Sequence, residues 1–404
     1  MEMKCRGCKS EKINLVLDLG NQPWCNDFLT EERVGTEEKY PLRLCYCEDC
    51  ELLQLDHTVP KETMFADHQY LSGMTTTLVN HFYEVAEENV KQFRMQPDDL
   101  VVDIGGNDGS QLLQYKKAGV NNVLNIESAK RVSCISRDAG VKTVNEFFNE
   151  DSAKKHLGEK TVKLYNASGV FFHLEELHSV IKGIKYSLRD DGILVVQFMY
   201  AGAMIENGNF DTIYHEHLCY YTIRSLNNLL KPYGMEIFDA YASDIHSGSI
   251  IAKICHNHSD LNVQTDRFLE LLEKDNEYSI QRTLEFAESV KQNKHALREL
   301  LTDIKNKNKS VYVYGAPAKG NTLLNYFGID RTLVDKAVEI NPMKIGHFLP
   351  QSHIPICQET KDDLPDYYLL LSHNFAKEIL NKNKDIIAQG VKFIIPFPKL
   401  EVID

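Results

Sequence analysis

Acid–base side chains are concentrated in residues 211–217, which read Asp211-Thr212-Ile213-Tyr214-His215-Glu216-His217. Three interpretations fit these residue types. His215 and His217 could bind a metal, although the H-E-x-x-H motif is absent and no third ligand is obvious. The side chains could instead form a buried polar network without chemistry. In the third interpretation an imidazole, whose pKa suits proton transfer near neutral pH, acts as a general base beside the carboxylate.

Six of the ten cysteines lie within the first 50 residues. Cys5-x2-Cys8 and Cys47-x2-Cys50 are two knuckles that together supply four thiolates for a tetrahedral zinc ion. In a reducing compartment such a cluster indicates a metal site rather than disulfides, and the alternative is a set of free thiols. Because four ligands leave no open position, the zinc is predicted to be structural, with a hairpin or loop between the knuckles. Two further cysteines of this region have no settled role: Cys25 and Cys45.

Composition sets the broad class of the protein. A chain of 404 residues with 43% apolar and 25% charged residues predicts a globular protein of two to three domains. The net charge of −13 argues against nucleic-acid binding but allows a local basic pocket for a phosphorylated ligand. The start of the chain lacks a signal-peptide core, and the apolar run at 192–205 is too short to span a bilayer. We therefore expect a cytoplasmic protein, without a membrane or nucleic-acid partner, and a monomer.

The middle of the chain carries a cofactor-binding pattern. A predicted strand at 100–104 contains Asp103 and leads into Gly105-Gly106-Asn107-Asp108-Gly109 and a helical pattern. Glycines let a ligand approach the backbone, and the helix N-terminus offers N–H donors. The next predicted strand, 123–126, ends in Glu127, about 20 residues further on, where an acid that binds a ribose diol belongs. The D-x-G-x-x-x-G pattern resembles motif I of class I S-adenosylmethionine (SAM) methyltransferases, and the alternative is an unrelated βαβ turn.

Polar residues of the following segments extend this pattern. In the SAM-dependent methyltransferases that the motif resembles, an adenine-side polar residue and an aromatic residue usually lie where this chain has Asn145 and Phe147. Two more buried strands are predicted at 162–166 and 192–198, and Asn166 stands at the carboxyl end of the first. That edge of an open α/β sheet holds the ligand, so His173, just beyond it, is a candidate for the same pocket.

A second glycine turn begins a C-terminal unit. A predicted strand at 311–314 leads into Gly315-Ala316-Pro317-Ala318-Lys319-Gly320-Asn321-Thr322, and a second strand at 333–339 ends in Glu339. A helix N-terminus beside the ammonium of Lys319 suits a phosphate group. Two half-Rossmann units predict two ligands, a cofactor in the middle and a phosphorylated substrate here. The alternative is a purely structural α/β domain.

These patterns predict an α/β protein of three parts. Residues 1–65 form the zinc-binding module, 66–258 the class I methyltransferase domain of Rossmann-like fold, and 259–404 a C-terminal Rossmann-like domain. Within them, residues 66–98 are predicted to be a helical connector, 220–258 to be rich in strands, and 260–309 to be amphipathic helices that bridge domains.

The order of these parts resembles the sugar C-methyltransferase family, whose members include SAM-dependent C-3′-methyltransferases of nucleotide-linked deoxysugars. The residues that carry the resemblance are 18–20 with Gln22-Pro23, 103–109, 214–217, 315–322 and Asn341-Pro342-x-Lys344-x-Gly346. The resemblance implies methyl transfer to carbon, C-3, beside the ketone of a nucleoside-diphosphate 4-keto-deoxysugar. His217 would remove the C-3 proton to leave an enolate, which imidazole can do once nearby donors stabilise the enolate.

The resemblance also assigns the remaining site residues. The residues that would position the sugar and stabilise the enolate are Tyr70, His173, Tyr214 and Glu216. The residues that would bind the nucleotide sugar are Gly315, Lys319, Asn321, Glu339 and Lys344. His215 is left with a structural role. Departures from the family pattern leave the base and the sugar open: Ser372-His373-Asn374 replaces a Trp-Asn pair, Glu339 replaces Asp, and 350–353 replaces a Pro-Gly turn. Transfer to oxygen or nitrogen, and a scaffold without turnover, are the other interpretations.

Overall fold

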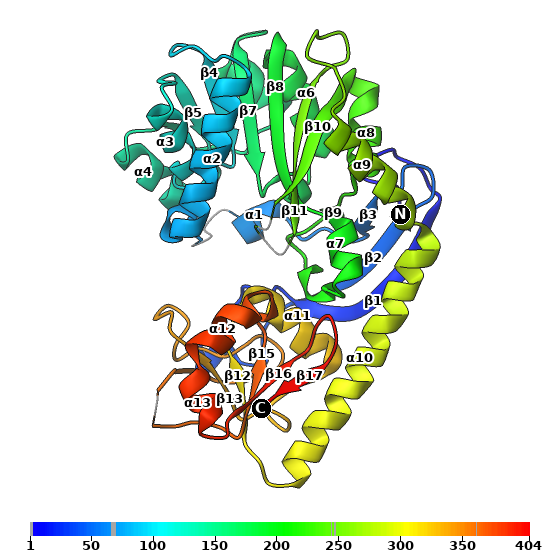
Figure 1. The fold of residues 1–404 in the computed structure, drawn as a ribbon, viewed down its shortest axis with the longest axis vertical. Coiled ribbons are helices and arrows are strands. Elements are labelled where there is room, and N and C mark those ends of the chain that lie inside the picture. The colour runs from blue at the N-terminus through cyan, green and yellow to red at the C-terminus, as the bar shows by residue number, and fades with distance from the viewer. Residues whose placement is uncertain (1–2, 66–69, 244, 246–247, 361) are drawn as a thin grey trace.

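The computed structural model describes residues 3–65, 70–243, 245, 248–360 and 362–404. The chain is an α/β protein built on three sheets, one in each predicted part (Figure 1). Among the described residues, none of the helices combines the length and the apolar character needed to cross a membrane.

The N-terminal sheet has the strand order β1-β2-β3-β9 and is antiparallel. Its strands are β1 (Ile13–Pro23), β2 (Lys39–Cys47), β3 (Leu53–Leu55) and β9 (Cys219–Tyr220). The predicted hairpin between the knuckles is confirmed, since β1 and β2 pair from Ile13↔Cys47 to Pro23↔Lys39. Strand β9 comes from the middle of the chain, directly after residues 211–217. The acid–base segment is therefore joined to the zinc-binding module through the sheet.

The central sheet has the order β10-β11-β8-β7-β4-β5-β6, parallel from β6 to β8, with β11 antiparallel to β8. Its strands are β4 (Leu100–Ile104), β5 (Val123–Ile126), β6 (Lys142–Val144), β7 (Val162–Ser168), β8 (Leu188–Met199), β10 (Met235–Ser243) and β11 (Ser249–His256). The strands predicted at 100–104 and 123–126 are confirmed. β7 runs two residues past the predicted end at Asn166.

Helices cover both faces of the central sheet and form two apolar layers. The helices of this part are α1 (Lys61–Phe65), α2 (Thr76–Gln92), α3 (Ser110–Lys117), α4 (Lys130–Asp138), α5 (Glu150–His156), α6 (Leu177–Ser187), α7 (Ala201–Glu206) and α8 (Ile223–Leu230). The short 3-10 turns are η2 (Ser72–Met74), η3 (Phe171–His173), η4 (Phe210–Thr212) and η5 (Lys231–Tyr233). The helical connector predicted at 66–98 is confirmed over α2, while residues 66–69 lie outside the described residues.

The expectation of a strand-rich region at 220–258 was wrong over α8. Thr222 and Ser225 form a capping box, in which each side chain accepts a hydrogen bond from the other residue's backbone N–H. Ile223, Leu226 and Leu230 then recur on one buried face at helical spacing. β10 and β11 fulfil the rest of this prediction, while part of the turn between them (244, 246–247) lies outside the described residues.

The C-terminal sheet has the order β14-β13-β12-β15-β16-β17 and is parallel except for β17. Its strands are β12 (Val311–Tyr314), β13 (Lys336–Glu339), β14 (Ile356–Gln358), β15 (Tyr367–Leu370), β16 (Lys392–Ile395) and β17 (Glu401–Ile403). Its helical elements are α11 (Ala318–Phe327), η8 (His373–Phe375), α12 (Ala376–Lys382) and α13 (Lys384–Ala388). The second strand–turn–helix unit is therefore present, as predicted.

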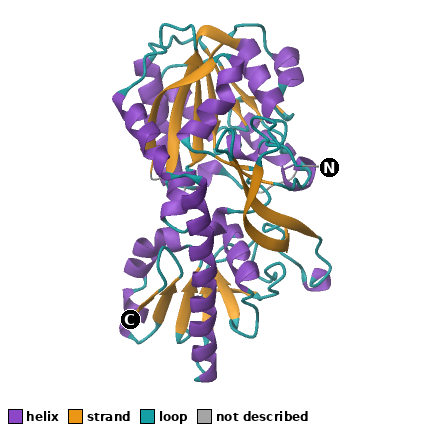
Figure 2. Cartoon of the chain, turned by 90° about the vertical axis from the view of Figure 1, so that its right-hand side faces the viewer, coloured by secondary structure: helices purple, strands orange, loops and turns teal. Residues whose placement is uncertain are grey.

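Two amphipathic helices connect the central and C-terminal sheets. α9 (Asp266–Lys274) packs beside β10, and α10 (Ile280–Asn306) runs along one side of the molecule toward the C-terminal sheet (Figures 1 and 2). This bears out the expectation of bridging helices. The β1–β2 hairpin spans the same two parts beside α10, so the sheets are linked by a strand pair as well as by a helix (Figure 2).

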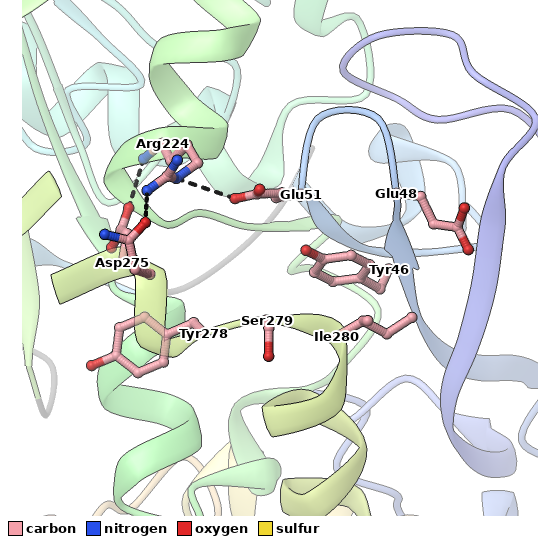
Figure 3. A pocket seen from close by; sticks show the side chains of 9 residues that line it. Tyr46, Glu48, Glu51, Arg224, Asp275, Tyr278, Ser279 and Ile280 are labelled. Atoms are coloured by element: carbon pink, nitrogen blue, oxygen red, sulfur yellow. Dashed lines mark hydrogen bonds and ion pairs between the residues drawn. The ribbon is translucent and has the colours of Figure 1, made fainter. Parts of the chain in front are cut away.

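A polar pocket marks the junction where α10 begins (Figure 3). Arg224 lies near Glu51 of the zinc-binding module, at 3.3 Å, and its backbone N–H donates to Asp275 at 2.7 Å. Tyr200 donates a further hydrogen bond to Asp275. These contacts hold the zinc-binding module, the central unit and the turn η7 (Asp275–Glu277) together ahead of α10.

Candidate active site

His217 lies within a group of aromatic rings drawn from two elements. Its ring centroid is 3.8 Å from that of Tyr214, 4.8 Å from Phe172 and 5.0 Å from His173. Its Nδ1 is 2.8 Å from the carbonyl oxygen of Thr212, so the Nδ1–H donates there. This contact selects the neutral tautomer with the lone pair on Nε2. The ring is thus oriented, and is chemically suited to accept a proton.

His173 meets His217 because η3 follows the carboxyl end of β7, as the sequence predicted. Its Nδ1 donates to the backbone carbonyl of Glu216 at 2.6 Å, and its ring packs on Phe65 with centroids 5.2 Å apart. A backbone hydrogen bond from Leu218 N–H to the Phe172 carbonyl closes the same junction at 2.8 Å. The structure therefore brings two of the predicted catalytic histidines into contact.

Glu216 is held by two residues that the sequence reasoning missed. The indole N–H of Trp24 and the side-chain amide of Asn26 both donate to Glu216 Oε1, each at 2.6 Å. Burial raises the pKa of Glu216, and the two donors act in the opposite direction. Both donors follow strand β1, immediately after the Gln22-Pro23 pair. That position next to a family motif was the signal that could have found them.

Tyr214 and Tyr70 differ in their surroundings. Burial first, and then the nearby Glu216, raises the pKa of Tyr214 well above its usual value, so the hydroxyl stays protonated and can donate. The backbone carbonyl of Tyr70 accepts a hydrogen bond from the Asn107 side chain at 3.0 Å, and the Tyr70 side chain is exposed. The structure thus ties Tyr70 to the first glycine turn.

His215 packs against the zinc-binding module. Its ring makes an edge contact with Tyr40, and its Nε2 lies 3.3 Å from the Tyr40 carbonyl oxygen. The side chain is buried, and burial lowers its pKa to about 4. These contacts are those of a packing residue, in keeping with the structural role expected for it.

The low pKa of His215 predicts a loss of stability in acid. An unfolded histidine takes up a proton near pH 6.5, whereas the folded one resists it down to about pH 4. As pH falls through this window the unfolded state gains protons, so the free energy of unfolding should decrease by up to about 3 kcal/mol. Urea unfolding at pH 7, 6 and 5 measures this effect. His215→Gln should flatten that part of the profile, and an unchanged slope would contradict the assignment.

The first glycine turn has the geometry of a cofactor cradle. Gly105 and Gly109 adopt φ values of +61° and +79°, which favour glycine. A Cβ on Gly109 would lie 2.6 Å from Ser136 Oγ, and one on Gly105 would lie 3.0 Å from Val170. The Asn107 N–H donates to Glu127 Oε2 at 3.0 Å, which joins the turn to the end of β5.

Asp103 places a buried carboxyl group beneath this turn. The residue is buried, and neither carboxylate oxygen has a hydrogen-bond partner among the described residues. Burial, and then the neighbouring Glu127, raises the pKa of Asp103 well above its usual value. A positively charged ligand would relieve both effects. SAM, which carries an ammonium and a sulfonium group, fits a buried carboxyl group in this position.

The other predicted cofactor residues lie in two places, with Asn145 and Phe147 near the end of β5 and Asn166 inside the sheet. The Asn145 amide donates to the carbonyls of Glu127 and Ser128, at 2.9 and 2.8 Å, and Lys61 lies 4.6 Å from the Phe147 ring centroid. Asn166 is buried inside the sheet, opposite Asp103 in the β4–β7 register, and accepts a hydrogen bond from the Tyr115 hydroxyl at 3.0 Å. Asn166 therefore lies within the strand rather than at its carboxyl edge.

The four predicted zinc ligands converge. The sulfur atoms of Cys5, Cys8, Cys47 and Cys50 all lie within 4.8 Å of one another, which fits a four-thiolate zinc site. The two cysteines of unsettled role lie outside this set and are buried as free thiols: Cys25 and Cys45.

The second glycine turn gathers most of the predicted substrate residues. Gly315 has φ +80°, Glu339 accepts a hydrogen bond from the Ala316 N–H at 3.0 Å, and Lys344 donates to the Ala316 carbonyl at 2.7 Å. Burial lowers the pKa of Lys344, whose ammonium also lies 4.7 Å from the Phe28 ring centroid.

Lys319 and Asn321 of the same turn face other parts of the chain. Lys319 donates to Asn374 at 3.0 Å and forms an ion pair with Asp211 at 3.5 Å. Asn321 is buried and donates to the Cys25 carbonyl at 2.7 Å, so its amide supports the segment that carries Trp24.

Comparison with known proteins matches the three parts separately and the chain as a whole. The family models are "Putative zinc binding domain" at residues 5–65, "Methyltransferase domain" at 80–240 and "C-methyltransferase C-terminal domain" at 244–398. The C-methyltransferase NovU of Streptomyces niveus is 30% identical over 410 residues, covering 99% of this chain and 96% of NovU.

Solved structures match a smaller share of the chain. A SAM-dependent methyltransferase from Thermotoga maritima is 16% identical and covers 44% of this chain and 90% of its own, with a TM-score of 0.34. The complex of the Haloferax volcanii Trm112 activator with a methyltransferase contains a chain that is 10% identical, covering 45% of this chain and 94% of its own, with a TM-score of 0.37.

The matched domains, the glycine turn and Asp103, whose carboxyl oxygens have no partner in the described part of the chain, define a SAM-dependent methyltransferase with a four-cysteine zinc-binding module. SAM supplies the methyl group, and Gly105, Gly109, Asp103 and Glu127 are the residues that would hold it. Within that class, the relationship to NovU extends over 99% of this chain and 96% of NovU. The protein belongs to the C-methyltransferase family, which confirms the resemblance seen in the sequence.

Proposed function

We propose that this enzyme methylates C-3 of a nucleoside-diphosphate 4-keto-deoxysugar. The observation that carries the proposal is the setting of His217, whose Nδ1–H is held by the Thr212 carbonyl while its ring contacts Tyr214 and His173. Methyl transfer to carbon requires a base to remove the proton from a weakly acidic C–H group. Transfer to oxygen or nitrogen requires less acid–base assistance, so a positioned base favours transfer to carbon. The glycine turn at Gly315, with Lys319 beside it, is the proposed binding site of the diphosphate.

The proposed reaction proceeds in two steps. His217 Nε2 takes the C-3 proton, and the electron pair of the C–H bond forms the enolate with the C-4 ketone. The protonated hydroxyl of Tyr214 is a donor for the developing oxyanion, while His173 and Glu216 position the sugar. The enolate carbon then forms a bond to the methyl group as the bond from that methyl to sulfur breaks. S-Adenosylhomocysteine and the C-methylated keto-sugar are the products.

A direct assay tests this proposal. The purified enzyme, incubated with SAM and thymidine- or uridine-diphosphate 4-keto-6-deoxysugars, should add one methyl group and release S-adenosylhomocysteine. NMR of the product should place the new methyl on C-3. A methyl group on oxygen or nitrogen would overturn the proposal, as would SAM binding without turnover of any 4-keto-sugar.

Removal of either hydrogen-bond donor to Glu216 should lower kcat in a pH-dependent way. Hydrogen bonds to a charged group are worth about 1.5–3 kcal/mol, so Trp24→Phe or Asn26→Leu should each lower kcat at least about tenfold. Burial remains while a donor is lost, so the pKa of Glu216 should rise further. Because less of the carboxylate is ionised at low pH, the loss should be greatest there and should shrink as pH rises. A pH profile of kcat measures both effects.

Asn14 offers a matched control for this prediction. Its amide donates to Glu48, just after β2, at 2.7 Å, but this hydrogen bond is exposed. Asn14→Leu should leave the profile unchanged. Identical pH profiles for Trp24→Phe and the unmodified enzyme would show that Glu216 does not depend on its donors.

A further inference from the structure

Asp211 is a buried carboxylate that the proposed reaction does not use. It lies in η4, is fully buried, and belongs to the central unit, yet its charged partners come from the C-terminal unit. His373 Nε2 donates to Asp211 Oδ2 at 2.9 Å, and Lys319 Nζ lies 3.5 Å from the same oxygen. Burial opposes ionisation, but Lys319 and then His373 outweigh it and hold the pKa of Asp211 below its usual value. Asp211 is therefore a charged contact between the two units.

One of these partners stands at the proposed diphosphate site. Lys319 lies in the first turn of α11, directly after the second glycine turn, and its side chain is 18% exposed. Its ammonium also donates to Asn374 Oδ1 at 3.0 Å. A phosphate group that approaches the glycine turn would compete with Asp211 for this ammonium.

On its other side, Asp211 is covalently joined to the residue that orients the base. The carbonyl of the next residue, Thr212, accepts the Nδ1–H of His217 at 2.8 Å. The residue before it, Phe210, stacks on Phe327 at the far end of α11, with ring centroids 5.0 Å apart. η4 is thus held against α11 by an ion pair at the start of the helix and by ring packing at its end.

We propose that Asp211 is a positioning residue that couples nucleotide binding at Lys319 to the orientation of His217. When a diphosphate binds the Lys319 ammonium, the ion pair between Lys319 and Asp211 weakens and η4 can shift. The Thr212 carbonyl belongs to η4, so a shift of η4 changes the orientation of the His217 ring. Conversely, the ion pair with Asp211 partly neutralises the Lys319 ammonium and so lowers its affinity for the nucleotide diphosphate. This coupling rests on the proposed function, since it assigns the diphosphate to Lys319 and the proton transfer to His217.

Asp211→Asn tests the coupling because its two expected effects have opposite signs. The variant frees Lys319, so the affinity for thymidine or uridine diphosphate, measured by calorimetry, should rise about threefold to tenfold. Exchange of the C-3 proton of the keto-sugar into heavy water, measured without SAM, should fall about tenfold or more. A purely structural defect would weaken both. Equal or weaker diphosphate binding, or an exchange rate within twofold of the unmodified enzyme, would overturn the proposal.

Two further variants serve as a control and as a substitute for Asp211→Asn. Asp363→Asn removes an exposed carboxylate that pairs with Lys336 in the C-terminal unit, and it should leave both measurements unchanged. If Asp211→Asn does not fold, His373→Phe removes one donor to Asp211 and leaves the carboxylate in place. It should slow exchange while SAM affinity stays constant, and an unchanged exchange rate would again overturn the proposal. Absence of exchange by the unmodified enzyme would instead overturn the proposed function.

Discussion

His217→Ala should reduce methyl transfer by about 10²- to 10⁴-fold, the usual contribution of a positioned general base. The Nδ1–H of His217 is fixed by the Thr212 carbonyl, so Nε2 is the atom that we propose takes the proton. Exchange of the C-3 proton into heavy water, followed by NMR in the absence of SAM, should fall by a similar factor. SAM affinity should stay the same, because the glycine turn that would hold SAM is formed by Gly105 and Gly109 on other elements.

An exposed histidine provides the control for this experiment. His258 follows β11 and stacks on His256, and its side chain is 63% exposed. His258→Ala should keep full activity. Full activity of His217→Ala, in contrast, would exclude His217 as the base. His173, in the same group of rings, would then be the next candidate for the base.

Loss of one zinc ligand should have the largest effect on stability. Cys47→Ser removes a buried thiolate from the four-cysteine cluster. Structural zinc contributes about 10–16 kcal/mol of apparent binding free energy in zinc-finger peptides, so several kcal/mol of folding free energy should be lost here. Metal analysis should find the variant depleted of zinc, and urea unfolding should give a lower midpoint. Activity should also fall, because β1 follows the first knuckle and leads into Trp24 and Asn26, which hold Glu216.

Cys45→Ser is the matched control for the zinc-ligand variant. Cys45 is a buried cysteine on the same strand, two residues from Cys47, but it lies outside the cluster. It should retain zinc and activity. Zinc content and stability of Cys47→Ser equal to those of the unmodified enzyme would contradict the four-cysteine assignment.

Local sequence determined much of this protein. Each C-x2-C knuckle brings its own two thiols together, because the spacing within a knuckle is set by a few backbone torsions. The two knuckles meet through the pairing of β1 with β2, from Ile13↔Cys47 onward. The strands before both glycine turns were predicted because apolar runs bounded by glycine depend on neighbouring residues alone. The helix α8 was not predicted, because a short run of apolar residues fits a buried strand as well as a buried helix, and only the Thr222–Ser225 capping box marks the helix start.

Tertiary structure decided how the acid–base segment is supported. Glu216 receives its donors from Trp24 and Asn26, which lie 192 and 190 positions earlier in the chain. Asp211 meets His373, 162 positions later. No local pattern encodes such contacts, since they depend on how the β1–β2 hairpin and α11 pack against the loop before β9. Residue types predicted His217 as the base, but only the packing of three units around it shows what orients its ring.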